Sequence, residues 1–264
     1  MTSPSEKLLV ALQDGIKRIT INRPERRNSV DHETVQLLRD AVQHSVADGT
    51  RVVILTGAGD SFCAGADLAA TSASDIANFD VTKALRENVN PTILAMRNLP
   101  VPIIARVHGH AVGVGCNYAL ACDMIVASEQ ALFGQVFVRI GLMPDGGSTF
   151  FLPRLVGYQK AFELMTTGDI IGAQEAQQLG IVNKVVPFSE LDATVDTIAA
   201  RLAQAPGMAI GKIKAGLNHG SQSDLSAALE FEAVNQDACF HSPDFVEGVT
   251  AFVQKRKAVF GKGA

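Results

Sequence analysis

The 264-residue sequence contains no tryptophan and only two tyrosines. Proteins that bind single-stranded nucleic acid stack the bases on aromatic side chains, and this chain offers little material for such stacking. Its formal net charge is −4, and its lysines and arginines are scattered, whereas a nucleic-acid-binding surface gathers them. We therefore expect a small-molecule substrate and no nucleic-acid partner.

Paired cysteines and long apolar runs are missing as well. The four cysteines form no CxxC pair, and their spacing suits neither a zinc site nor a small disulfide framework. No apolar run reaches the roughly 20 residues of a membrane helix, and the N-terminal residues resemble neither a secretory signal nor a transit peptide. We expect a cytoplasmic protein with no membrane association and no metal.

The apolar residues recur in a pattern of alternating strands and helices. Asp14-Gly15 predicts a hairpin turn between two short strands. Asp31 predicts the cap of a helix whose apolar face is Val35, Leu38, Val42 and Val46. Further strands are expected at 52–56, 103–107 and 123–127, and further helices up to Leu99, at 114–121 and after Asp145. This alternation indicates an α/β fold.

The pattern changes near residue 173, after which the chain is almost entirely helical. The predicted helices are 173–179, 189–204, 209–218, 225–240 and 243–260, with one strand at 182–186. We expect an α/β core of residues 1–190 that holds the substrate site, and a helical C-terminal region, 191–264. Such appended helices cover a site or build an oligomer.

Two glycine-rich turns are the candidate site. In the first, residues 63–67 (CAGAD), small side chains would let a ligand lie against backbone N–H groups. The preceding TGAG lacks the third glycine of a dinucleotide-binding motif, since Phe62 stands there. In the second, residues 113–115 (GVG), a helix begins, so free amides and its positive dipole end point outward together. Together the turns predict an oxyanion-binding site.

Several segments carry a specific resemblance. NRPERRNS, ILTGAGDSFCAGADL, residues 109–123, LMPDGGS and FVQKR, in this order along nearly the whole chain, resemble the crotonase (enoyl-CoA hydratase/isomerase) superfamily. The resemblance implies a spiral of strand-strand-helix repeats with a helical C-terminal trimerisation region. It also implies a homotrimer or a dimer of trimers, and an acyl-CoA thioester as substrate rather than cofactor.

The resemblance assigns residues of the substrate site. The thioester oxygen would lie between the N–H groups of Ala66 and Val114, beside Gly65 and Gly113. Preorganised donors stabilise the enolate that forms when a proton leaves the carbon next to the thioester. The remaining coenzyme contacts implied by the family pattern are Arg26, Ala64, Asp67, Leu68 and, at the phosphates, Lys255. Asp67 also suits the first turn of a helix.

The reaction depends on the carboxylates near the second turn. Hydratases of the superfamily resemble one another in two glutamates, but this chain has Asn117 and Phe137 in those positions. Asp145 lies where isomerases of the superfamily carry their catalytic acid, and Leu142 would help to keep its pocket apolar. One carboxylate suffices to carry a proton between two carbons. The pattern resembles the enoyl-CoA isomerase and 1,2-epoxyphenylacetyl-CoA isomerase branch.

Alternatives remain open at this point. Asp145 could instead, or also, cap a helix starting at Gly146. A hydratase, a thioester hydrolase or a catalytically silent acyl-CoA-binding module would share the fold. His108 and His110 fall on opposite faces of a strand and predict no shared metal, and Cys63, without a paired base, suits packing better than nucleophilic catalysis.

Overall fold

Two β-sheets form the centre of the molecule. The computed structural model describes residues 7–68 and 78–261. Within them, the larger sheet runs in the order β1 (Leu8–Gln13), β2 (Ile16–Ile21), β3 (Val52–Gly57), β4 (Ile103–Val107), β6 (Met124–Ser128), β9 (Lys184–Val186). The smaller sheet runs in the order β5 (His110–Val112), β7 (Leu132–Gly134), β8 (Ile170–Gly172). All neighbouring strands pair in parallel except β1 with β2 and β7 with β8.

The chain crosses between the two layers in a regular way. β4 leads into β5 and β6 into β7, and β5 pairs with β7 in the smaller sheet. Isolated bridges join Val30 to Ala66 and Cys63 to Ala111, so the segments after β2 and β3 extend the second layer in the same order. Each of these segments then leads to a helix. This is the strand-strand-helix spiral, and the expected fold is confirmed.

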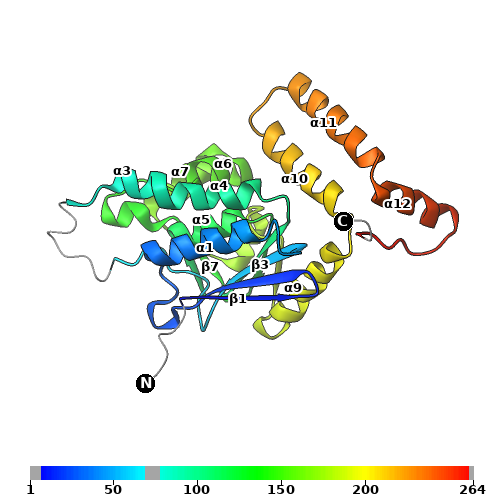
Figure 1. The fold of residues 1–264 in the computed structure, drawn as a ribbon. Helices are drawn as coiled ribbons and strands as arrows, with labels where there is room; N and C mark the ends of the chain where they lie inside the picture. Colours follow the sequence, from blue (N-terminus) through cyan, green and yellow to red (C-terminus); the bar gives the residue numbers. More distant parts are fainter. Residues whose placement is uncertain (1–6, 69–77, 262–264) are drawn as a thin grey trace.

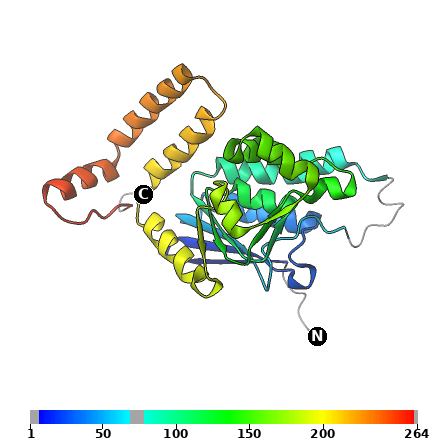
Figure 2. The ribbon, with the colours of Figure 1, turned by 180° about the vertical axis from the view of Figure 1, so that it is seen from behind.

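Helices cover both layers (Figures 1 and 2). Those of the spiral are α1 (His32–His44), α3 (Val81–Ala84), α4 (Asn90–Asn98), α5 (Val114–Ala121), α6 (Ser148–Val156), α7 (Tyr158–Thr167) and α8 (Ala173–Gln178). A 3-10 helix, η1, spans Pro24–Arg26, a π-helical turn, η2, spans Leu85–Val89, and a second 3-10 helix, η3, spans Val136–Ile140. No helix of the described residues is long and apolar enough to span a membrane.

The predicted caps and turns explain where the first elements begin and end. Asp14 and Gly15 both have positive φ, 51° and 75°, as a tight hairpin turn requires. The Asp31 side chain accepts from the Thr34 N–H, which confirms the N-cap of α1. Val46 does not join the buried face of α1, because the helix ends at His44 and leaves that side chain 65% exposed.

The remaining helices follow β9. They are α9 (Phe188–Ala203), α10 (Gly207–Gly220), α11 (Leu225–Phe240) and α12 (Pro243–Val253). The last helix is shorter than expected, because the chain leaves it at Gln254 and Lys255 takes a positive φ of 53°. Leu191, Val195 and Ala199 of α9 are buried against the larger sheet. Residue 190 lies inside α9, so we propose to place the domain division at residues 204–206 instead.

The segment α10–α12, named here the arm, projects from the core (Figure 1). α10 is tied to the core by Lys214, whose buried ammonium donates to the carbonyl oxygens of Met96 and Val101 and to the carboxylate of Asp123 at 2.9, 3.2 and 2.8 Å. α11 has no buried residue in all its 16 positions. The arm therefore has one anchored helix and two that leave much apolar surface uncovered.

Candidate active site

The first turn is joined to Val30 by two backbone hydrogen bonds. The Val30 N–H donates to the Gly65 carbonyl at 2.9 Å, and the Asp67 N–H donates to the Val30 carbonyl at 3.0 Å. In this parallel bridge Ala66 is the residue paired with Val30. Because successive peptide groups of an extended chain point to opposite sides, the Ala66 N–H points away from Val30. It faces outward, at an exposed position.

The second turn packs directly against the first. A Cβ at Gly115 would lie 2.2 Å from the Cys63 carbonyl oxygen, so only glycine allows the start of α5 to approach this closely. Gly113 has a φ of 58°, and a Cβ there would lie 3.8 Å from the Gly65 Cα. The structure thus brings the two glycine turns into contact.

Ala66 and Val114 each present a backbone donor at this junction. Val114 is the first residue of α5, where an N–H has no acceptor within the helix. Over residues 7–68 and 78–261, neither of these two N–H groups donates to a backbone carbonyl. The neighbouring Gly113 N–H, by contrast, is used by the Gly134 carbonyl at 2.9 Å. Two unused donors beside a positive helix end suit an oxygen that gains negative charge.

Asp145 lies next to the N-terminal turn of α5. A Cβ at Gly146 would lie 3.6 Å from Val114 Cγ2 and 3.4 Å from Asn117 Cβ, which places the turn after Asp145 against this helix. The Asp145 Oδ1 atom is buried and has no hydrogen-bond partner among the described residues. Burial raises the pKa of this carboxyl above its ordinary value. Such a group both takes and returns a proton more readily near neutral pH.

The proposed capping role of Asp145 is wrong. α6 begins at Ser148 with Gly147 as its N-cap residue, so the Asp145 side chain caps no helix. The Ser148 N–H donates instead to the backbone carbonyl of Asp145, at 3.1 Å. Gly146 and Gly147 both have positive φ, 53° and 82°, which delays the start of the helix by two residues. The carboxylate is left without this structural task.

Asn117 belongs to a buried network of uncharged side chains. Its Nδ2 donates to the Asp145 carbonyl at 2.9 Å, and its Oδ1 accepts from Gln135 Nε2 at 2.8 Å. Ser148 Oγ donates to Gln135 Oε1 at 3.0 Å and closes the network. The Asn117 side chain therefore positions the Asp145 turn, and it titrates at no ordinary pH. Gln135 and Ser148 were not expected here, because only the fold brings them to Asn117.

Phe137 and Leu142 form an apolar side of the site. Phe137 lies in η3, and it is 9% exposed. Its Cζ atom lies 4.0 Å from the position of a Cβ at Gly113, beside the second turn. The Leu142 N–H donates to the Phe137 carbonyl at 3.1 Å, while the Leu142 side chain is 50% exposed. Neither residue supplies a proton-transferring group.

The expected coenzyme contacts near the first turn lie at an outer rim. The Ala64 N–H donates to the Arg27 carbonyl at 3.0 Å, which brings Ala64 beside the exposed Arg26. Leu68 is 56% exposed. The structure therefore brings Arg26 and Ala64 together at the surface, next to the turn that carries Ala66.

Asp67 has a partner that the sequence did not indicate to us. Its carboxylate pairs with Arg23 at 2.6 Å, and the same guanidinium lies 3.6 Å from Asp31. The expected helix after Asp67 would occupy residues 69–77, which lie outside the described residues. Arg23 lies two residues after the end of β2, and no local sequence signal pairs it with Asp67.

Lys255 lies far from the rest of the expected site within one chain. It follows α12 at the end of the arm, whereas η1 and the first turn lie in the core, and both views separate them widely (Figures 1 and 2). Its side chain is exposed. Lys255 therefore does not meet Arg26 in the same copy of the chain.

His108 lies between β4 and β5, His110 begins β5, and Cys63 is packed in the core. His108 is buried between Arg106 and the Gly59 carbonyl, while the ring of His110 lies 3.5 Å from a serine hydroxyl. The part of the chain that the structure describes contains no group of three or more metal-binding side chains. Burial raises the pKa of the Cys63 thiol to about 12, so it stays protonated and packed.

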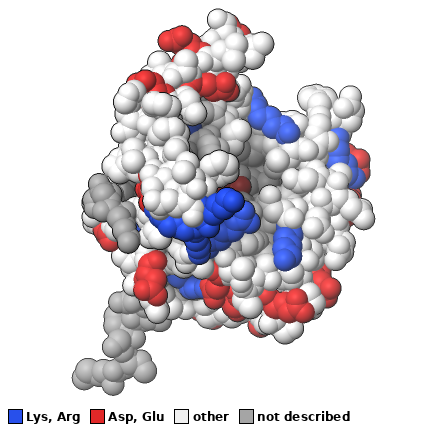
Figure 3. Space-filling view, turned by 90° about the vertical axis from the view of Figure 1, so that its right-hand side faces the viewer, with Lys and Arg blue, Asp and Glu red and all other residues white. Residues whose placement is uncertain are grey.

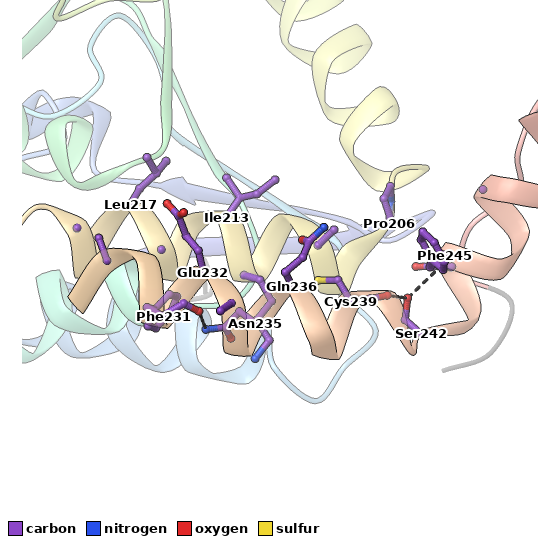
Figure 4. A pocket seen from close by; sticks show the side chains of 18 of the residues that line it. Pro206, Ile213, Leu217, Phe231, Glu232, Asn235, Gln236, Cys239, Ser242 and Phe245 are labelled. Atoms are coloured by element: carbon purple, nitrogen blue, oxygen red, sulfur yellow. Dashed lines mark hydrogen bonds between the residues drawn. The ribbon is translucent and has the colours of Figure 1, made fainter. Parts of the chain in front are cut away.

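The large groove of the molecule belongs to the arm and not to the glycine turns. It has a volume of about 1320 Å³ and lies between α10, α11 and α12. Figure 4 shows its side chains, among them Ile213, Leu217, Phe231 and Phe245. On the face toward the arm a hollow opens between patches of lysine and arginine, and much of the arm carries no charge (Figure 3). Apolar side chains supply most of the exposed lining of this groove.

Comparison with known proteins adds to this geometry. Residues 11–263 match the family model described as enoyl-CoA hydratase/isomerase. A crotonyl-CoA hydratase of Syntrophomonas wolfei is 40% identical over 97% of this chain and 98% of its own length. A 1,2-epoxyphenylacetyl-CoA isomerase of Escherichia coli is 34% identical over 97% and 98%. The crystal structure of an enoyl-CoA hydratase of Mycobacterium smegmatis superimposes with a TM-score of 0.91 at 30% identity, covering 97% of this chain and 99% of the other.

Proposed function

Because this chain belongs to the enoyl-CoA hydratase/isomerase family, we propose that it is an acyl-CoA isomerase that moves a double bond or opens a ring through an enolate. The observation that carries this proposal is Asp145: a partly buried carboxylate with an unpartnered oxygen beside the two unused donors. The substrate class is an enoyl-CoA ester or 1,2-epoxyphenylacetyl-CoA.

The proposed reaction uses two groups of the protein. The N–H groups of Ala66 and Val114 hold the thioester oxygen. Asp145 takes a proton from one carbon of the acyl chain, and the electron pair of that C–H bond moves to the thioester oxygen, which becomes an enolate. The enolate then collapses as Asp145 returns the proton two carbons away, so the double bond has moved and no water is consumed. Each donor contributes about 10²–10³ in rate to such a step.

The side chains around Asp145 favour isomerisation over hydration. Hydration needs one group to activate water and another to protonate carbon. Asn117 is engaged in hydrogen bonds on both sides of its amide, and Phe137 presents a ring. Neither of them can transfer a proton, so Asp145 would have to serve both steps. The relatives named as hydratases leave hydration as the main alternative.

The test replaces Asp145 by Asn and measures isomerisation of a 3-enoyl-CoA. We expect the substitution to lower kcat by about 10²–10⁴, the usual contribution of a general acid–base, with little change in binding. Asp237→Asn, at a side chain that is 75% exposed, is the matched control and should keep full activity. Undiminished turnover by the Asp145→Asn protein would remove this carboxylate from the mechanism.

A second measurement separates the competing functions. The protein is incubated with a saturated acyl-CoA in deuterated water, and exchange beside the thioester is followed. Exchange needs only the base and the oxyanion-binding donors, so an isomerase exchanges and a silent acyl-CoA-binding module does not. Incorporation of oxygen from labelled water into the product would instead indicate a hydratase or a thioester hydrolase.

We further propose that the chain works as a homotrimer or a dimer of trimers. The uncovered apolar side chains of the arm favour an obligate contact, among them Leu225, Leu229, Val234, Phe240, Val246 and Phe252. Because Lys255 does not reach Arg26 of its own chain, we propose that it meets the coenzyme phosphates of a neighbouring copy. The unpaired cysteines are in keeping with a cytoplasmic location, which we also propose.

A further inference from the structure

Tyr118 is a buried polar side chain that the proposed reaction does not yet use. It lies on α5, its exposed fraction is 0%, and its hydroxyl has no hydrogen-bond partner among the described residues. A buried polar atom without a partner destabilises the folded state, and such atoms are rare in folded proteins. The buried hydroxyl of Tyr118 therefore calls for a partner or a function.

The spacing along α5 locates the ring of Tyr118. Residues three and four positions apart lie on one face of a helix. Three positions before Tyr118, Gly115 packs on the Cys63 carbonyl, and four positions before it, Val114 packs on Gly146. In a helix a long side chain leans over the turn that precedes it, and this geometry directs the Tyr118 ring toward both contacts.

Electrostatics agrees with this placement. After burial, the nearby groups Cys63 and Asp145 are the further causes that raise the pKa of Tyr118. Asp145 is itself a group with an unpartnered buried oxygen, Oδ1. Two orphan polar atoms, one a hydroxyl that can donate and the other a carboxylate that can accept, share one buried environment.

The other elements packed on α5 bring no competing charge to this place. Arg97 of α4 donates to the carbonyl of Ala121, at the far end of α5. Arg154 of α6 is exposed and stacks on a phenylalanine ring. His110 of β5 lies beside the hydroxyl of Ser61. Cys63 and Asp145 are thus the titratable groups that act on Tyr118, and the Cys63 thiol stays protonated.

We propose that Tyr118 is a positioning residue for Asp145: its hydroxyl donates to the charged carboxylate through one bridging water molecule, since the two groups make no direct hydrogen bond. This inference rests on the proposed function in that Asp145 is the acid–base. Donation to the charged form favours that form, so Tyr118 opposes the effect of burial on Asp145 and holds the carboxylate toward the acyl chain.

The first experiment removes only the hydroxyl, by Tyr118→Phe. The pH at which kcat/KM reaches half its maximum should rise by about one to two units, because the charged form of Asp145 loses a donor. The melting temperature should fall only slightly, because one water-mediated hydrogen bond is lost while the ring, which fills the core, is kept. A lower kcat with an unmoved pH profile would reduce Tyr118 to a packing role and overturn the proposal.

The second experiment needs no catalysis. Tyr158, the only other tyrosine of a chain without tryptophan, is 71% exposed and stacks on Phe162. In the Tyr158→Phe protein all tyrosine emission comes from Tyr118, and nearby carboxylates quench it. We expect emission to change with pH in one transition that Asp145→Asn abolishes.

The activity assay and the emission measurement test different claims: the first tests the proposed function, and the second tests the interaction of Tyr118 with Asp145. If Asp145→Asn keeps its isomerase activity, the proposed function fails, yet the emission still reports whether Tyr118 and Asp145 interact. An emission that does not titrate, or titrates equally with Asn at 145, overturns the inference itself. Tyr158→Phe alone should leave the pH profile of kcat/KM unchanged, which makes it the kinetic control.

Discussion

At the scale of single residues, the proposed site divides into groups that would hold charge and one group that would move a proton. The holding groups are backbone amides, fixed by the contact between the two glycine turns. The moving group is Asp145, a side chain kept free by two glycines that postpone the start of α6. A carboxylate in this setting is useful for chemistry and costly for folding.

The free-energy cost of burying the charged Asp145 carboxylate predicts how stability depends on pH. Burial raises the pKa of Asp145 above its ordinary value of 3.8, so the folded protein binds this proton more tightly than the unfolded chain. Its contribution to stability therefore falls as pH rises from 3.8 through the raised pKa, and it stays lost above that. The amide of Asp145→Asn carries no such charge.

We expect the Asp145→Asn protein to melt above the wild type at pH 7, because the amide does not have to bury a charge. The difference should disappear below pH 3.8. Differential scanning calorimetry across this pH range measures it, with Asp237→Asn as the exposed counterpart. A variant less stable than the wild type at pH 7 would show that hydrogen bonds to the carboxylate, such as the one proposed from Tyr118, outweigh the cost of burying it.

At the scale of elements, the close approach of α5 to the first turn sets the geometry of the site. Gly115→Ala places a methyl group 2.2 Å from the Cys63 carbonyl oxygen, so the helix must move outward. We expect a loss of about 1–3 kcal/mol in unfolding free energy. We also expect kcat/KM to fall by about 10²–10³, because the Val114 donor moves with the helix.

Chemical denaturation and steady-state kinetics measure the two effects. Gly172→Ala is the matched control, since nothing lies within 4 Å of a Cβ at that position and its φ is not positive. If Gly115→Ala lost stability but kept its activity, the position of α5 would matter less to the reaction than we infer.

The elements that were predicted well are those in which a hydrophobic or capping pattern extends over many residues. The buried strand β3, the capped helix α1 and the long helix α11 all appear close to their expected limits. β5, β7 and β8 have three residues each, too few to show a period of two, and they were not predicted as separate strands.

Contacts between distant segments were beyond sequence reasoning. The two glycine turns were identified from local spacing and the family resemblance. The Arg23–Asp67 pair and the Gln135–Asn117 bond join segments 44 and 18 residues apart. Nothing local marks such partners, because each becomes a neighbour only when the two sheets stack.

At the scale of the whole molecule, the arm is the part whose apolar side chains remain exposed in the single chain. Phe252, on α12, is 84% exposed. Phe252→Asp should weaken the assembly toward the 27.9 kDa monomer, because a carboxylate would have to be buried in the proposed contact. Sedimentation velocity measures the mass. Val46→Asp is the control: this exposed valine lies outside the arm, and its substitution should leave the mass of the assembly unaltered. A wild-type chain that sediments as a monomer contradicts the proposal.

The two donors of the oxyanion site are main-chain atoms, and this has a consequence for how such a molecule can diverge. No substitution at position 66 or 114 other than proline deletes an N–H, so random mutation rarely erases the ability to hold an enolate. The proton-carrying groups are side chains, each replaceable by a single codon change. Proteins of this fold can therefore acquire new proton-transferring side chains, and new reactions with them, while the two backbone donors are retained.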